Sequence, residues 1–121
     1  MKSNIEKGHK SEEAATIWLK QKGYFIRHRN WRYIKDEIDI VAENKDYIVF
    51  VEVKSRTSLD YGSPADNITE KKMRFNIRAA QAYIDMYEID KEARFDLMII
   101  VDEPARTEID HIEDAFRDYM R

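Results

Sequence analysis

Four charged side chains lie in two stretches whose other residues are typical of buried β-strands. Glu37 and Asp39 belong to the run E-I-D-I-V-A, and Glu52 and Lys54 belong to the run I-V-F-V-E-V-K. A carboxylate buried without a partner tends to take up a proton, so a charged Glu52 needs a metal ion, a lysine or several hydrogen bonds. Mg²⁺ and Mn²⁺ bind one or two carboxylates together with water and phosphate oxygens. The pattern therefore predicts a Mg²⁺ or Mn²⁺ site at Asp39 and Glu52.

The two stretches are expected to form an antiparallel hairpin that brings these groups together. If the chain turns at residues 45–46, Asp39 lies opposite Glu52 and Glu37 lies opposite Lys54. A slip of one residue would separate Asp39 from Glu52, whereas a slip of two would keep all four on one face. The other face of the first strand takes its apolar residues, which are Ile38, Ile40 and Ala42.

Lys54 has three candidate roles beside such a metal site. It could orient an attacking water, deprotonate it, or stabilise the charge on a phosphorane. Asp39 followed by Glu52-Val53-Lys54 has the D-(x)n-E-x-K layout of the PD-(D/E)xK nucleases. The alternative is a structural ion-pair network in which Glu37 pairs with Lys54 and Asp39 pairs with an arginine.

The remaining residues predict one α/β domain over 1–121, with a mixed central sheet and helices on both faces. The expected order is α-β-β-β-α-β-β-α, with Thr69 as the N-cap of the second helix. That helix has a core stripe of Met73, Ile77, Ala80, Ile84 and Tyr87. The expected elements are a helix from 3 or 8 to 22, a strand over 24–33, the hairpin, a loop over 55–67, a helix over 69–87, strands over 95–101 and 107–112, and a helix over 113–120.

Charge is distributed unevenly along the chain. Residues 1–84 carry 16 Lys and Arg against 12 Asp and Glu, whereas residues 85–121 carry 5 against 12. Basic residues mixed with aromatic ones suit a phosphate backbone and unstacked bases, so a nucleic acid is the expected partner. The alternative is that the strand over 24–33 is a solvated edge strand whose aromatic residues belong to the core, and that the basic face of the helix over 69–87 is only exposed to solvent. The candidate nucleic-acid contacts are Arg27, Arg29, Arg32, Arg56, Lys71, Arg74 and Arg78.

Composition excludes some classes of protein. The chain has no cysteine, which excludes a disulfide framework and thiolate chemistry. No apolar run reaches transmembrane length and residues 1–10 are polar, so the sequence is typical of a soluble cytoplasmic protein without a membrane partner.

The chain resembles the YraN-like family of small uncharacterised bacterial proteins. The resemblance runs through nearly the whole sequence and is far more specific than the D…E-x-K spacing. It is carried by Gly8, Glu12, Ala15, Gly23-Tyr24, Asn30-Trp31-Arg32, Glu37-Ile38-Asp39-Ile40, Phe50-Val51-Glu52-Val53-Lys54, Arg56, Gly62, Lys71, Arg94-Phe95-Asp96 and Ala115-Phe116. The family pattern usually has Gly where this chain has Ser11 and Asp36.

The resemblance implies a restriction-endonuclease-like fold similar to that of archaeal Holliday-junction resolvases. Asp39, Glu52 and Lys54 match the nuclease signature, and Glu12 matches a helix-borne carboxylate that joins the metal site in resolvase relatives. Glu37 matches a family position without an assigned role and is kept as a candidate catalytic residue.

Three hypotheses about function follow from the sequence. The first is a Mg²⁺- or Mn²⁺-dependent nuclease that acts on structured or damaged DNA. Cutting two strands would call for a homodimer, although the sequence identifies no dimer surface. The second is a non-catalytic nucleic-acid-binding module that retains a residual site. The third is a protein-interaction subunit that recruits a partner through its acidic C-terminal half.

Overall fold

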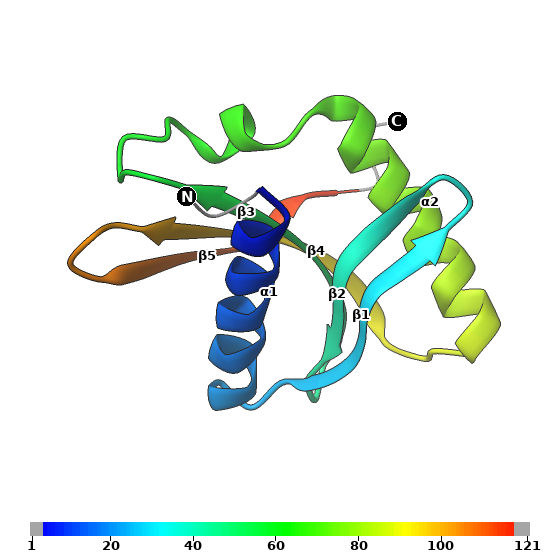
Figure 1. Cartoon of the computed structure of the whole chain (residues 1–121). Helices are drawn as coiled ribbons and strands as arrows, with labels where there is room; N and C mark the ends of the chain where they lie inside the picture. Colours follow the sequence, from blue (N-terminus) through cyan, green and yellow to red (C-terminus); the bar gives the residue numbers. More distant parts are fainter. Residues whose placement is uncertain (1–3, 118–121) are drawn as a thin grey trace.

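The computed structural model describes residues 4–117, and side chains from Gly8 onward. The chain alternates helices and strands in the order α-β-β-β-α-β-β, with one short 3₁₀ turn (Figure 1). The elements are α1 (Asn4–Gln21), β1 (Phe25–Tyr33), β2 (Asp36–Glu43), β3 (Tyr47–Arg56), η1 (Pro64–Asn67), α2 (Glu70–Tyr87), β4 (Glu92–Asp102) and β5 (Thr107–Phe116).

The five strands form one mixed sheet in the order β1-β2-β3-β4-β5. Neighbouring strands are antiparallel except β3 and β4, which are parallel because α2 connects them. The expected cap of α2 is confirmed, since the Thr69 side chain accepts a hydrogen bond from the Lys72 amide at 3.1 Å. The predicted mixed α/β architecture is therefore confirmed. Neither helix within residues 4–117 is long and apolar enough to cross a membrane.

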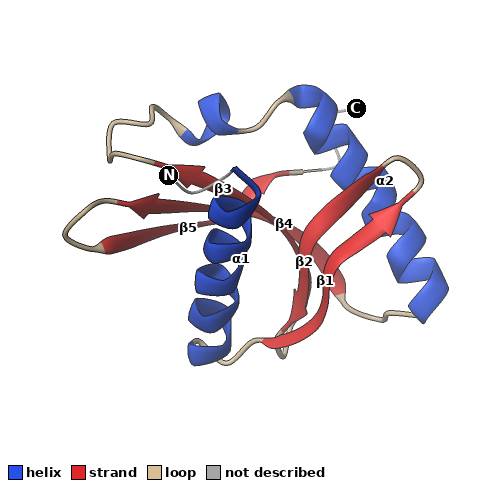
Figure 2. Cartoon of the chain, viewed as in Figure 1, coloured by secondary structure: helices blue, strands red, loops and turns tan. Residues whose placement is uncertain are grey.

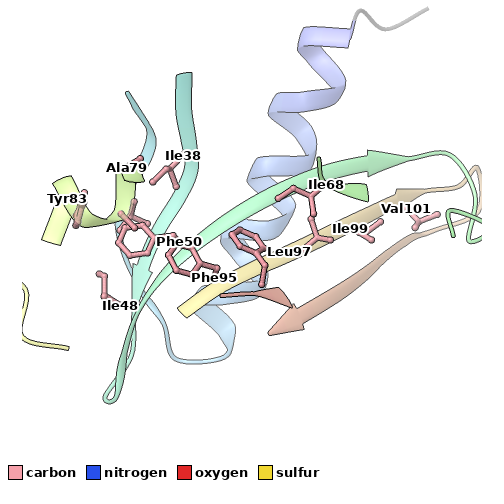
Figure 3. Packing of buried hydrophobic residues seen from close by; sticks show 13 residues of the cluster. Ile38, Ile48, Phe50, Ile68, Ala79, Tyr83, Phe95, Leu97, Ile99 and Val101 are labelled. Atoms are coloured by element: carbon pink, nitrogen blue, oxygen red, sulfur yellow. The ribbon is translucent and has the colours of Figure 1, made fainter. Parts of the chain in front are cut away.

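The helices cover opposite faces of the sheet, which explains why β3 is apolar on both sides (Figure 2). Ala15 and Leu19 of α1 join the cluster that contains Val49 and Val51. The cluster on the α2 face contains alternate residues of the same strand. It includes Phe50, Phe95, Leu97, Ala79 and Tyr83, and the rings of Phe50 and Phe95 stack with centroids 5.7 Å apart (Figure 3).

The predicted helix over 113–120 is wrong for residues 113–116, which continue β5. Phe116 pairs with Phe95 across the ladder after an irregularity between Phe95 and Leu97. The Phe116 ring is 3% exposed and stacks on the Phe95 ring at 5.2 Å, so packing against the sheet favours the extended conformation. The last part of the expected helix, including Tyr119, lies outside the described residues.

The buried face of α2 is rotated relative to the predicted core stripe. Met73, Ile77 and Ile84 are only partly buried, and Tyr87 is exposed. The residues that α2 buries most completely are Asn76, Ala79, Ala80 and Tyr83. Because residues four apart lie on one face of a helix, this rotation points Lys72, one turn before Asn76, toward the sheet.

Candidate functional site

The site lies where β2 separates from β3. The pairs from Glu43–Ile48 to Ile40–Val51 have the register that the sequence predicted, but the ladder ends at Ile40–Val51. The predicted backbone pairs Asp39–Glu52 and Glu37–Lys54 are therefore wrong. The β1–β2 ladder continues to Tyr33–Asp36, so the two strands leave β3 as a two-stranded ribbon.

The side chain of Asp39 bridges the strands at the point of separation. Its Oδ2 accepts a hydrogen bond from the Val53 amide at 2.8 Å. Ile38 joins the core cluster on the α2 face, whereas Ile40 joins the cluster on the α1 face. The prediction that Ile38 and Ile40 share a face is therefore wrong. The break coincides with Asn30, a left-handed residue (φ +52°) in β1 between the partners of Ile38 and Ile40.

Glu52 is the most deeply buried carboxylate of the site, with 3% of the residue exposed. Burial raises the pKa of Glu52 to about 9, and a hydrogen bond with Asp39 and the Asp39 charge add to this rise. Lys72 and Lys54 oppose it more weakly. Glu52 Oε2 is buried and has no hydrogen-bond donor among the described residues. At neutral pH Glu52 therefore retains a proton, which a cation could replace.

Lys72 is a site residue that the sequence did not reveal. Its Nζ donates hydrogen bonds to Asp36 Oδ2 at 2.8 Å and to the Glu37 carbonyl at 3.0 Å, and it lies 3.8 Å from Glu52 Oε2. The Lys72 side chain is 19% exposed. Only its spacing of four residues from Asn76, which α2 buries, could have indicated that Lys72 faces the sheet. That signal was hidden because both residues are polar and lie outside the predicted apolar stripe.

Glu12 reaches the same region from α1 but is bound by another partner. Asn30 Nδ2 donates a hydrogen bond to Glu12 Oε1 at 2.5 Å. Burial raises the pKa of Glu12, the Asn30 hydrogen bond opposes this rise, and the nearby Asp39 charge adds to it. Further contacts attach α1 to the strands. Arg29 pairs with Glu13 at 2.7 Å, and the hydroxyl groups of Ser11 and Ser55 are hydrogen-bonded.

Lys54 lies beside an open hollow of about 410 Å³ between the start of α1 and the end of β3. Ser11, Ser55 and Thr57 also line this hollow. Lys54 is close enough to Glu52 to lower its pKa. The arrangement thus places a lysine between a buried carboxylate and a space that a phosphate group could enter.

The chemistry of the donor set fits a hard divalent cation in part. No group of three or more carboxylate or histidine side chains within the described range is arranged to hold a metal ion. Asp39 and Glu52 form a pair, and Glu12 is close enough to Asp39 for their charges to interact. A pair suffices for Mg²⁺, which retains water and takes phosphate oxygens from its substrate. The specific observation that favours such a ligand is that the buried Glu52 Oε2 has no hydrogen-bond donor among the described residues, with only Lys72 Nζ 3.8 Å away.

The seven predicted nucleic-acid contacts fall into two groups. One group is held by other side chains: Arg27 binds Tyr83 and Glu43, Arg29 binds Glu13, Arg56 binds Asn67, and Arg74 binds Glu70. The other group is exposed and consists of Arg32, Lys71 and Arg78. Lys71 and Arg78 line a second hollow, between α2 and the turn of the β1–β2 ribbon.

The mixed sheet, the Asp39–Glu52 carboxylate pair where β2 separates from β3, and Lys54 define an α/β domain with a D…E-x-K arrangement. Residues 11–100 match the model of the uncharacterised protein family UPF0102, and the chain belongs to that family. A UPF0102 protein of Phocaeicola vulgatus is 42% identical over 116 residues, which cover 96% of each chain. A UPF0102 protein of Flavobacterium psychrophilum is 37% identical, covering 96% of this chain and 98% of its own. These relatives confirm the YraN-like resemblance.

Proposed function

We propose that this protein is a divalent-metal-dependent nuclease that hydrolyses phosphodiester bonds in structured or damaged DNA. The observation that carries the proposal is the Asp39–Glu52 pair, in which Glu52 is buried and its Oε2 has no hydrogen-bond donor within the described residues. A buried acid without a donor is costly unless a ligand compensates for it. Asp39 and Glu52 would hold Mg²⁺ or Mn²⁺, which supplies polarisation of the scissile phosphate and a more acidic water.

The side chains around the pair have separate tasks in this reaction. The Lys54 ammonium would orient the attacking water and stabilise negative charge on the phosphate oxygens. Glu12, whose pKa is raised by burial, would hydrogen-bond to water at the α1 side of the site. Hydrolysis joins the water oxygen to phosphorus and breaks one P–O ester bond, leaving a phosphate monoester and a hydroxyl group. Glu37 would act only through its backbone carbonyl, which accepts a hydrogen bond from Lys72.

A specific observation also favours a second candidate function, a nucleic-acid-binding module without turnover. Lys72 Nζ lies 3.8 Å from Glu52 Oε2, so the site contains a cation of its own. In that case the carboxylate pair would serve the fold. DNA binding would then persist in Asp39→Asn and Glu52→Gln, and no metal would produce cleavage.

The test is a cleavage assay on end-labelled branched, nicked, flapped, single-stranded and fully paired DNA, with Mg²⁺, Mn²⁺ or EDTA. We expect cleavage by the wild type with either metal. Asp39→Asn, Glu52→Gln and Lys54→Met should each lower the rate by about 100-fold or more, the usual loss for one group that stabilises a transition state. The matched control is Glu92→Gln, an exposed carboxylate at the start of β4, which should cleave at the wild-type rate. Absence of cleavage on every substrate, or an unimpaired Lys54→Met variant, would overturn the proposal.

A further inference from the structure

A second hollow lies between the turn of the β1–β2 ribbon and the first half of α2, with a volume of about 650 Å³. In Figure 1 this turn lies beside α2, at the end of the ribbon that has left β3. Its lining includes three apolar or aromatic residues and, among its basic residues, three that are exposed to solvent. They are Tyr33, Ile34 and Phe75, and Lys35, Lys71 and Arg78.

Ile34 at the tip of the ribbon is unfavourable for the fold in two ways. Its side chain is 72% exposed, the highest value among the exposed large apolar residues of the described chain. Its φ of +55° is left-handed, which is a genuine outlier for a β-branched residue and would suit Gly or Asn. Strain of this kind, at a position where burial cannot compensate, points to a role in binding.

The surroundings of Ile34 suit a nucleotide. The Phe75 ring lies 6.1 Å from the Tyr33 ring, and Trp31 stacks behind Tyr33 at 6.2 Å and 10°. The Tyr33 and Phe75 rings line the hollow and offer a surface for a base, because every base has a π-face. The single carboxylate of the hollow, Asp36, is paired with Lys72 at 2.8 Å, so the cations on the rim remain available to phosphates.

The hollow is connected to the candidate catalytic carboxylate through one side chain. Lys72 binds Asp36 and the Glu37 carbonyl just after the turn of the ribbon, lies 4.9 Å from the centre of the Phe75 ring, and lies 3.8 Å from Glu52 Oε2. A nucleotide held in the hollow would therefore lie next to the phosphate presented to Asp39 and Glu52.

We infer that this hollow receives a nucleotide displaced from the DNA stack, and that Ile34 inserts into the stack as a wedge in its place. Apolar side chains that enter between base steps unstack and kink DNA, at a cost that is lowest where pairing is already weak. The inference rests on the proposed function and specifies its substrate class, which is DNA with an unpaired or mispaired nucleotide beside the scissile phosphate.

The test measures binding by fluorescence anisotropy in EDTA, where no cleavage competes. The probes are a duplex with one bulged thymine and the same duplex without the bulge. We expect the wild type to bind the bulged duplex at least about 10-fold more tightly, since a single well-made base contact discriminates by this order. Permanganate, which oxidises unstacked thymines, should modify the bulged thymine less strongly when the protein is bound, because a base stacked on the rings of the hollow is shielded.

Ile34→Asn removes the apolar wedge and tolerates the left-handed backbone, so it should fold at least as well as the wild type. It should bind both duplexes with similar affinity and leave the bulged thymine as reactive toward permanganate as in free DNA. The matched control is Met86→Asn, which replaces a 64% exposed apolar residue near the other end of α2 and should keep the preference. The double variant Lys71→Ala/Arg78→Ala should weaken binding to both duplexes and reduce the slope of log K against log salt by about 1.8.

The outcomes separate the two proposals. If the wild type cleaves with Mg²⁺ or Mn²⁺ but Ile34→Asn keeps the preference for the bulge, the wedge is overturned and the nuclease proposal stands. If Ile34→Asn loses the preference while no protein cleaves, the wedge stands and the nuclease proposal is overturned. Equal binding of both duplexes by the wild type, or no binding, overturns the wedge in either case.

Discussion

Two buried carboxylates in neighbouring parallel strands have opposite environments. Asp96 in β4 is fully buried and accepts hydrogen bonds from Arg94 Nε at 2.9 Å, from Arg94 Nη2 at 2.8 Å and from the Asp114 amide at 3.0 Å. His111 Nε2 lies 2.7 Å from the same carboxylate. Glu52 in β3 has a similar burial, but its Oε2 has only the more distant Lys72 and no hydrogen-bond donor in the described chain.

The pKa values of the two acids move in opposite directions for this reason. Burial alone would raise the pKa of Asp96, but the hydrogen bonds from His111, Arg94 and the Asp114 amide outweigh it and lower the pKa. Burial and Asp39 raise the pKa of Glu52 to about 9. The difference teaches that the number of donors, rather than burial, distinguishes a carboxylate that holds strands together from one that is available to a ligand.

The largest expected effect is the loss of stability when Asp96, the carboxylate with several donors, is replaced. Asp96→Ala removes the buried carboxylate that pairs with Arg94 and leaves that guanidinium only Tyr24 and the more exposed Glu113, so it should lower the free energy of unfolding by about 3 kcal/mol. Urea denaturation monitored by circular dichroism measures this loss. The control is Asp90→Ala, an exposed carboxylate between α2 and β4, which should be neutral. A loss at Asp96 no greater than that at Asp90 would show that the network contributes no stability.

The second prediction concerns metal binding by Glu52 and Asp39. Mn²⁺ at 100 times its dissociation constant should stabilise the wild type by about 2.7 kcal/mol, because only the folded chain presents the Asp39–Glu52 pair. The rise in melting temperature on adding Mn²⁺ measures this stabilisation. At one fixed Mn²⁺ concentration the rise should be larger at pH 8 than at pH 6, because the metal must replace the Glu52 proton. Glu52→Gln should show no rise, whereas Glu92→Gln should respond like the wild type. An equal rise in Glu52→Gln would place the metal elsewhere.

The third prediction uses the raised pKa of Glu52 in the absence of metal. Glu52 has a pKa of about 9 in the folded chain and an ordinary value of 4.5. The folded chain thus binds an extra proton between these values, and the free energy of unfolding falls as pH rises across this window. Glu52→Gln removes this penalty and should be more stable than the wild type by about 2 kcal/mol at pH 6 and by less than about 1 kcal/mol at pH 5. Parallel stability–pH curves for the two proteins in EDTA would contradict the raised pKa.

The smallest effect is expected for Lys72, which lies between the β1–β2 ribbon and the Asp39–Glu52 pair. Lys72→Met removes hydrogen bonds to Asp36 and to the Glu37 carbonyl and should lower the free energy of unfolding by about 1 kcal/mol. It should also raise the pKa of Glu52 further, because Lys72 opposes that rise. Carboxyl ¹³C chemical shifts followed with pH measure the change. Lys71→Met, which alters the exposed neighbour, should leave the Glu52 titration unchanged; a similar shift in both variants would remove Lys72 from the site.

The sequence predicted those parts of the molecule that depend on local patterns. The apolar run around Glu52 gave β3 and its register with β2, and Thr69 marked the start of α2. It could not predict the separation of β2 from β3, because that depends on the left-handed conformation of Asn30 and the side-chain hydrogen bond of Asp39. Nor could it distinguish Asp96 from Glu52, since the donors to Asp96 come together only through the irregular pairing of β4 with β5.

The parallel pairing of β3 with β4 has a consequence for the order in which the site is assembled during folding. The Asp39–Glu52 pair belongs to a local hairpin, whose closure requires only a short loop. Lys72 arrives only when α2 docks and β4 pairs with β3, which are contacts between residues distant in sequence and therefore slower to form. In kinetic terms, we expect the acidic half of the site to form early and its lysine to join in the last step of folding.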